Sequence, residues 1–114
     1  MSDVSVLLVM TTFPTREKAD QMAALLVEKR LAACVSVQSE CRSVYRWHGA
    51  VEFANEVPLL IKTTDACYTE VEEAIRVVHP YETPEIIAVP LTDGLPDYLA
   101  WIVAETQEDR WPSL

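Results

Sequence analysis

Residues 34–63 read CVSVQSECRSVYRWHGAVEFANEVPLLIKT, and their apolar side chains recur at every second position. This period is that of a β-strand, in which successive side chains point to opposite faces. Gly49 tolerates the positive φ of a tight turn, so His48-Gly49 is predicted to divide the stretch into the two arms of a hairpin. The return arm, about 51–63, contains Pro58, which we expect at a sheet edge or a bulge because proline has no N–H to donate. The pattern predicts that one face of the first arm carries Val35, Val37, Ser39, Cys41, Ser43, Tyr45 and Trp47.

The length of this hairpin predicts an assembly. Fourteen residues at about 3.3 Å per residue span about 46 Å, whereas a compact domain of this size has a radius of gyration of about 13 Å. Arms of this length therefore bend or project beyond their own core. A projecting hairpin would expose Tyr45, Trp47 and Phe53 together with open strand edges, which soluble proteins usually cover. Because another copy of the same chain is the natural cover, the sequence predicts an oligomer.

The segments before the hairpin predict one strand and one helix. Residues 4–12 are apolar and rich in β-branched side chains, which is typical of a central strand buried on both faces. Thr15 is placed as the N-cap of a helix that follows. The expected inward stripe of this helix, spaced at i, i+3, i+4, i+7 and i+8, comprises Ala19, Met22, Ala23, Leu26 and Val27.

The segments after the hairpin predict a second helix, a strand and a third helix. Thr64-Asp65 is expected to cap a helix that runs to about residue 78, with an inward stripe of Val71, Ala74, Ile75 and Val78. A strand over 86–91 follows, and Pro90 limits it to an edge or an end of the sheet. The last helix is expected over 95–108, with Leu99, Ile102 and Val103 inward.

The order β-α-β-β-α-β predicts an α+β fold of the ferredoxin-like, split βαβ type with a long β-hairpin and an added C-terminal helix. We expect one domain over 1–114, with a core at about 4–106 and a tail at 107–114. A chain of 114 residues, half of them apolar, can bury a single core and is not intrinsically disordered.

The charge balance and the cysteines limit the partners and the compartment. With 18 acidic and 9 basic side chains the net charge is −9, which argues against nucleic acid and anionic membranes as partners. The three cysteines, Cys34, Cys41 and Cys67, form no C-x-x-C pair, so reduced thiols in the cytoplasm are expected. The N-terminal segment lacks the basic start of a signal peptide. No apolar run reaches the roughly 20 residues that span a bilayer.

Few residues in this chain point to a reaction. There is no Gly-rich phosphate loop, G-x-S-x-G or H-E-x-x-H, so we predict no catalytic residues, no enzymatic activity and no organic cofactor. His79 precedes the loop 80–85, PYETPE, which two prolines stiffen. An imidazole and carboxylates held there can form part of a copper or zinc site. Alternatively, His79 caps the end of the second helix, where a positive charge is favoured.

Other side chains allow two interpretations each. Cys34 is either a small buried apolar residue or a metal ligand. Lys62 lies in an apolar strand, where it either extends to the surface or binds an anionic ligand between subunits. The aromatic residues expected to pack or to form an interface or cleft are Tyr45, Trp47, Tyr81 and Trp101.

Five segments together resemble the CutA family of divalent-cation-tolerance proteins. They are LAACV at 31–35, SVYRWHG at 43–49, LIKTT at 60–64, HPYETPEI at 79–86 and YLAW at 98–101. The resemblance runs from about residue 4 to residue 103 and does not include the tail after Thr106. It implies a homotrimer similar in plan to P-II signalling proteins, and a role in tolerance to copper and other divalent metals. It implies no established enzymatic activity.

The resemblance also implies candidate metal ligands. His79 and Glu85 match the H-P-Y and P-E parts of the family's block, and Cys34 matches its A-A-C segment. Some members have a cysteine at the end of the first strand, where this chain has Met10. The first functional hypothesis is therefore a homotrimer that binds copper or another divalent cation. The second is a P-II-like trimer whose clefts bind a small anionic ligand or a partner protein, chiefly through Lys62 and the cleft aromatics.

Overall fold

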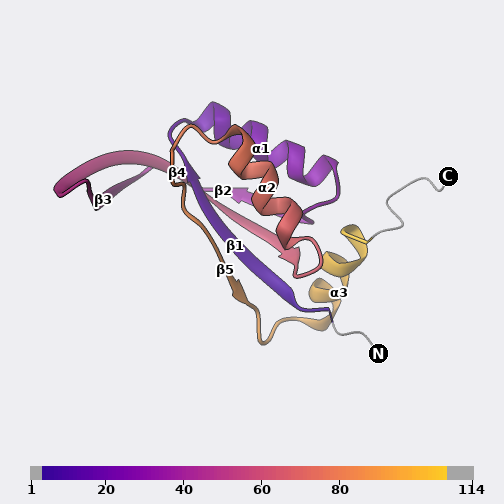
Figure 1. Ribbon diagram of the computed structural model, residues 1–114. Coiled ribbons are helices and arrows are strands. Elements are labelled where there is room, and N and C mark those ends of the chain that lie inside the picture. The colour runs from indigo at the N-terminus through magenta and orange to yellow at the C-terminus, as the bar shows by residue number, and fades with distance from the viewer. Residues whose placement is uncertain (1–3, 108–114) are drawn as a thin grey trace.

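The computed structural model describes residues 4–107. Along this part of the chain the order of elements is β1, α1, β2, β3, β4, α2, β5 and α3 (Figure 1). The strands are β1 (Val6–Phe13), β2 (Cys34–Val37), β3 (Cys41–Trp47), β4 (Ala50–Thr64) and β5 (Ile86–Pro90). The helices are α1 (Arg16–Glu28), α2 (Tyr68–Val78) and α3 (Pro96–Glu105). This is the α+β, ferredoxin-like order that the sequence predicts.

The sheet is antiparallel and its path is β2-β4-β1-β5, with β3 pairing to the far part of β4. β1 is central as expected, because Val9 is paired with Ile61 of β4 on one side and with Ala88 of β5 on the other. β5 is an edge strand, and Pro90 is its last residue. The predicted position of this proline is therefore confirmed.

Both α1 and α2 cover the same face of the sheet (Figure 1). On that face Val9, Leu59 and Ile61 are completely buried with the inward residues of the two helices. On the opposite face of β1, Leu8 and Met10 are only half-buried in the single chain. The expectation of a strand buried on both faces therefore holds for one face only. The buried residues of α3 pack at one end of the sheet, in a second cluster with Val6 and Ala33.

The helices end their buried stripes earlier than the periodicity predicts. Thr15 does cap α1, since its Oγ1 accepts from the N–H of Lys18 at 3.2 Å. Leu26 is fully buried, but Val27 is 42% exposed, because a residue at i+8 has turned part of the way around the helix. In α2, Val78 at i+7 lies only about 20° off the stripe, yet it is 56% exposed because it is the last residue of the helix. The predicted burial of Val27 and Val78 is wrong.

The other two helix boundaries also differ from expectation. Asp65 accepts a hydrogen bond from the N–H of Ser5 at 3.2 Å, and the N-cap of α2 is Cys67, which makes no side-chain capping bond. The predicted cap at Thr64-Asp65 is therefore wrong. α3 ends at Glu105 and its C-cap is Thr106, so it is shorter than the expected 95–108. The tail predicted at 107–114 lies, except for residue 107, outside the described residues.

The first arm of the hairpin is broken by a bulge. Val37 pairs with Leu59 while Cys41 pairs with Glu56, so three residues, 38–40, stand opposite the two residues 57–58. The N–H of Gln38 donates to the carbonyl of Pro58 at 2.9 Å. Because an antiparallel residue directs its N–H and C=O to the same side, the missing N–H of Pro58 also faces this interruption. The prediction of Pro58 at a bulge is confirmed.

The extra residue turns the outer part of the first arm over. Val35 and Val37 lie on the helix-covered face, opposite Ile61 and Leu59. In contrast, Ser43, Tyr45 and Trp47 are paired with Ala54, Glu52 and Ala50, whose side chains point to the other face. The prediction that all odd-numbered residues of this arm share one face is therefore wrong. One inserted residue is enough to exchange the two faces of a strand.

The hairpin projects from the body of the chain (Figure 1). Its tip is a two-residue turn in which His48 and Gly49 have φ of 51° and 82°, as predicted for this position. The described chain measures 49 × 32 × 23 Å, and its radius of gyration is 15.2 Å, above the roughly 13 Å of a compact domain. On one hairpin face Val44, Val51 and Phe53 are each more than half exposed. None of the described helices has the length and apolar character needed to cross a membrane.

Substitutions of two neighbouring residues of α1 test which side of the helix faces the core. We expect Leu26→Ala to lower the free energy of unfolding by about 2–5 kcal/mol, because it leaves a cavity against the sheet. Val27→Ala should change it by less than about 0.5 kcal/mol, since Val27 lies at the surface. Urea denaturation at a fixed protein concentration measures both values. Equal losses in the two variants would contradict the orientation of α1.

Candidate functional site

A pocket of about 830 Å³ lies where the hairpin meets the end of β1 and the loop after α2. We call it the hairpin pocket. It brings together Tyr45, Trp47, Tyr81 and Glu85 of the residues that the sequence singled out. The bulge makes this possible, because it places Tyr45 and Trp47 on the sheet face away from the helices. The other lining residues are Thr12, Ser43, Val44, Arg46, Glu56, Glu82, Thr83 and Pro84.

Glu56 is the buried polar residue of the hairpin pocket. Its side chain is almost fully buried, and its Oε1 accepts a hydrogen bond from Oγ of Ser43 at 2.6 Å. Tyr81 donates its phenolic proton to the same carboxyl group. Burial, together with this hydrogen bond and the nearby charge of Glu56, raises the pKa of Tyr81 to about 12. These contacts fasten the loop after α2 to the hairpin.

Sequence reasoning missed Glu56. It is one polar residue among several in the return arm, and its spacing does not distinguish it from Glu52. Its burial depends on Tyr81, 25 residues later in the chain, folding back over the strand. A carboxylate directly before Val57-Pro58, the pair opposite the bulge, is the only local signal, and it is a weak one.

His79 lies at the end of α2 and is buried beside the pocket. Its Nδ1 lies 3.1 Å from the backbone nitrogen of Tyr81, and its Nε2 lies 2.6 Å from the carbonyl oxygen of Thr12. Because a backbone N–H can only donate, Nδ1 accepts and Nε2 carries the proton. The ring also contacts Phe13 and Tyr81, with centroid distances of 4.6 and 4.8 Å. The imidazole therefore joins the ends of α2 and β1 to the pocket loop.

Neither sequence-based interpretation of His79 describes this arrangement fully. The residue is the C-cap of α2, and its backbone N–H donates to the carbonyl of Ile75. Its ring, however, bonds to β1 and not to the end of the helix. As a ligand, the ring already has the supporting contact of many metal-bound histidines, which donate their second N–H to a backbone carbonyl. An ion at Nδ1 would have to displace the N–H of Tyr81.

The candidate ligands do not form a complete metal site in one chain. Glu82 and Glu85 are exposed on the pocket loop near His79. Among residues 4–107, no group of three or more His, Cys, Asp or Glu side chains is placed to hold an ion. Any complete site therefore needs water, a local rearrangement or a donor from another subunit.

The other predicted residues lie away from the hairpin pocket. Cys34 is paired with Lys62, and both are half-buried on the sheet face away from the helices. Lys62 is six residues along β4 from Glu56, a separation of about 20 Å. Trp101 lies on α3, where it stacks on Tyr98 with a centroid distance of 5.6 Å. The structure thus does not bring Cys34 to His79 and Glu85.

Comparison with known proteins now gives the family. The family model of the CutA1 divalent ion tolerance protein matches residues 7–105. The divalent-cation tolerance protein CutA of Thermus thermophilus is 42% identical over 98 residues, which are 86% of this chain and 95% of that protein. Mouse protein CutA is 41% identical over 103 residues, which are 90% of this chain and 58% of the mouse protein. The chain belongs to the CutA1 family of divalent ion tolerance proteins.

Solved structures agree with this assignment. The crystal structure of CutA from Xylella fastidiosa superimposes with a TM-score of 0.87 at 40% identity, covering 90% of this chain and 99% of the other. The crystal structure of CutA1 from Oryza sativa superimposes with a TM-score of 0.88 at 34% identity, covering 91% of this chain and 95% of the other. The resemblance seen in the sequence is therefore confirmed. The family is described by tolerance to divalent ions and not by a reaction.

The hydrogen bond between Tyr81 and Glu56 predicts a dependence of stability on alkaline pH. The pKa of Tyr81 rises from 10 to about 12 in the folded chain, so its proton stabilises the fold below pH 10, and this contribution is lost as the pH rises to about 12. We expect Tyr81→Phe to remove this part of the pH dependence of the unfolding free energy.

Tyrosinate absorbance provides the direct measurement. Tyr81→Phe should remove the titration step near pH 12, whereas Tyr98→Phe, a control on α3, should leave that step in place. An unchanged step in Tyr81→Phe would contradict the contact with Glu56.

Proposed function

We propose that this chain acts in divalent-metal tolerance as a homotrimer that binds a divalent cation at the hairpin pocket. One observation carries the choice of a cation. The carboxyl groups of Glu56, Glu82 and Glu85 line the pocket against the single guanidinium of Arg46. Such a lining favours a positive ligand, whereas the alternative P-II-like binding of a small anion would meet an excess of negative charge.

His79 and Glu85 are the proposed ligands at this pocket. A neutral imidazole and carboxylates bind Cu(II) most strongly among the common divalent ions, so copper is the expected ion, although this order applies to most such sites. The bond from Nε2–H to Thr12 supports the proposal, because it holds the ring while Nδ1 exchanges its partner. The remaining ligands would come from water or from another subunit.

Cys34 is proposed as a ligand at a separate position. It lies on the sheet face away from the helices, as does Met10 of β1. A thiolate and a thioether on one face suit a softer ion such as Cu(I). In a trimer this face would lie between subunits, so such a site would form only on assembly.

The homotrimer is supported by two exposed apolar surfaces. Ile87 and Val89 of β5 lie on the sheet face that the helices leave open, and both are more than 40% exposed. The projecting hairpin adds Val44, Val51 and Phe53. Contiguous apolar surfaces of this kind are normally covered by another chain.

The remaining expectations are part of the same proposal. The three cysteines are free thiols in the described chain, and this is consistent with the cytoplasm as the proposed compartment. Relatives differ in this respect, since one from Archaeoglobus fulgidus is described as periplasmic and one from Arabidopsis thaliana as chloroplastic. We propose no catalytic role, no organic cofactor, and no binding to nucleic acid or membranes.

Calorimetric titration with Cu(II) and with Zn(II) tests the metal site. We expect near-stoichiometric binding per subunit, tighter than micromolar. His79→Ala should abolish it by removing the imidazole ligand. Glu85→Gln should weaken it while preserving the hydrogen bonds of His79. Glu17→Gln, an exposed carboxylate of α1 outside the pocket, should leave binding unchanged.

Weak binding that is equal in all four proteins would refute the site, and would mean that ions only gather on an acidic surface. A titration with inorganic phosphate tests the alternative, an anion-binding site. Saturable phosphate binding that Lys62→Ala removes, in the absence of specific metal binding, would instead favour the P-II-like alternative.

Light scattering tests the assembly. We expect a mass three times the 12.8 kDa of the chain. Val89→Asp should reduce this mass, because it places a charge on the open sheet face, whereas Val27→Asp on α1 should not. A wild-type mass equal to one chain would contradict both the trimer and the inference from hairpin length.

A further inference from the structure

The hairpin pocket is larger than a single metal ion requires. Its volume of about 830 Å³ lies in the range of cavities that hold small organic molecules, roughly 300–1,000 Å³. An ion bound by His79 and Glu85 would occupy only the part next to the loop after α2. The remaining space faces β3, where Tyr45 and Trp47 form the wall.

Three aromatic side chains share this space. Tyr45 and Trp47 are two positions apart on β3, so they lie on one face of the strand, with their Cα atoms about 7 Å apart. Tyr81 lines the pocket from the loop after α2. The pKa of Tyr81 is raised by burial, by Glu56 and also by the charge of Tyr45, so the hydroxyl groups of the two tyrosines lie near each other.

Neighbouring contacts hold these rings in place. The indole of Trp47 meets the ring of His48 nearly edge-on, with a centroid distance of 4.9 Å and an interplanar angle of 84°. Tyr81 is held by its hydrogen bond to Glu56 and by the ring of His79, whose centroid is 4.8 Å away. Trp47 is nevertheless 39% exposed, so part of its surface is open to a ligand. A site with ordered walls loses less entropy when it binds.

The charges around the rings favour a positive ligand. Glu56 is almost fully buried in the wall of the pocket, and Glu82 and Glu85 line it from the loop. Arg46 also lines the pocket, but its side chain starts on the opposite face of β3 from that of Trp47, because side chains alternate along a strand. The aromatic wall therefore faces carboxylates.

The hydrogen bonds of Glu56 indicate which class of cation suits this wall. Its carboxyl group already accepts from the hydroxyl groups of Ser43 and Tyr81, so it supplies negative charge more readily than a vacant acceptor. A primary ammonium group needs acceptors for three N–H bonds. A quaternary ammonium group has none to satisfy, and aromatic faces attract its charge through their quadrupole. Rings beside an occupied carboxylate thus favour the quaternary cation.

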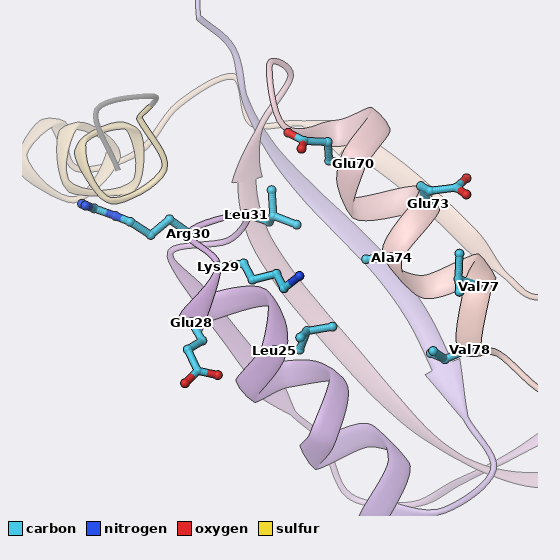
Figure 2. A pocket seen from close by; sticks show the side chains of 10 residues that line it. All are labelled: Leu25, Glu28, Lys29, Arg30, Leu31, Glu70, Glu73, Ala74, Val77 and Val78. Carbon is cyan, nitrogen blue, oxygen red and sulfur yellow. The ribbon is translucent and has the colours of Figure 1, made fainter. Parts of the chain in front are cut away.

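A second hollow, between α1 and α2, shows what distinguishes the hairpin pocket. This groove has a volume of about 720 Å³, and the ten residues that line it are aliphatic or charged (Figure 2). Leu25 and Val77 are among them, together with the carboxylates of Glu70 and Glu73. The groove is similar in volume and also has carboxylates, but its lining offers a cation no aromatic face.

We propose that the hairpin pocket binds a small quaternary ammonium compound between Tyr45, Trp47 and Tyr81, beside the carboxylate of Glu56. This class of ligand goes beyond the proposed divalent cation, since none of these four side chains is a proposed metal ligand.

Choline and its neutral isostere 3,3-dimethyl-1-butanol test the proposal in the wild-type protein. The two molecules have the same shape, but only choline carries a charge. Calorimetric titration in a buffer that contains EDTA makes the outcome independent of any metal site. We expect saturable binding of choline at one site per subunit, about tenfold tighter than binding of the neutral alcohol. Equal binding of the two molecules, or no saturable binding of choline, would overturn the proposal.

Substitutions of two tryptophans with similar exposure locate the site. Trp47→Leu should weaken choline binding about tenfold, and Trp47→Phe, which keeps an aromatic face, should weaken it less. Trp101→Leu on α3 should leave it unchanged, since Trp101 is 42% exposed but lies outside the pocket. Glu56→Gln keeps the size of the side chain and should weaken choline binding several-fold. Unchanged binding in Trp47→Leu, or an equal loss in Trp101→Leu, would contradict this site.

Titration of Trp47→Leu with Cu(II), without EDTA, separates this proposal from the proposed function. The variant should bind Cu(II) as the wild type does, because the indole is not a proposed ligand. A protein that binds choline but no metal would contradict only the divalent-cation site. A protein that binds the metal but not choline would contradict only the ammonium site.

Discussion

The one extra residue between β2 and β3 determines which side chains of the outer hairpin lie on each face of the sheet. Pro58 cannot donate on the side of the bulge, yet its pairing with Thr12 of β1 continues through this point. The body of the sheet therefore stays regular while the outer arm is turned over. Tyr45 and Trp47 reach the face where the loop after α2 lies, and Glu56 is buried there with hydrogen bonds from Ser43 and Tyr81. Without the bulge, these aromatic side chains would lie on the helix-covered face and the pocket would lose one wall.

His79 also holds the elements of this site together. Its two ring nitrogens connect the last turn of α2, the end of β1 and the loop that carries the carboxylates. The structural role of the ring and the proposed metal-binding role would compete for one lone pair, on Nδ1. An ion that takes this lone pair releases the N–H of Tyr81, and Tyr81 is also the partner of Glu56. Binding at the imidazole would therefore be felt at the hairpin through two hydrogen bonds.

Periodicity was sufficient for the order of elements and for the inner residues of each stripe, and residue type was sufficient for the turn at His48-Gly49 and for the N-cap at Thr15. It failed at Val27, where α1 has turned away from the sheet, and at Val78, which is the last residue of α2. It also failed at the bulge, because an inserted residue leaves the apolar spacing of each arm unchanged. Glu56 depends on a contact between distant segments, which no local pattern contains. Residue chemistry suggested His79, the carboxylates of its loop and Cys34 as ligands, and the family resemblance selected Glu85 among the carboxylates. The topology separates Cys34 from His79 and Glu85.

The edges of the main sheet also limit how copies of the chain can join. β2 has four residues, and β5 has five and ends in a proline. Neither edge offers a long row of free backbone groups for an unlimited succession of strands. The longest stretch of backbone without a second strand partner belongs to the hairpin, which the bulge separates from the main sheet. Few copies can pair with the hairpin, and each can do so in one orientation only. This favours small closed assemblies over fibres and helps to keep a chain with exposed apolar surfaces from aggregating.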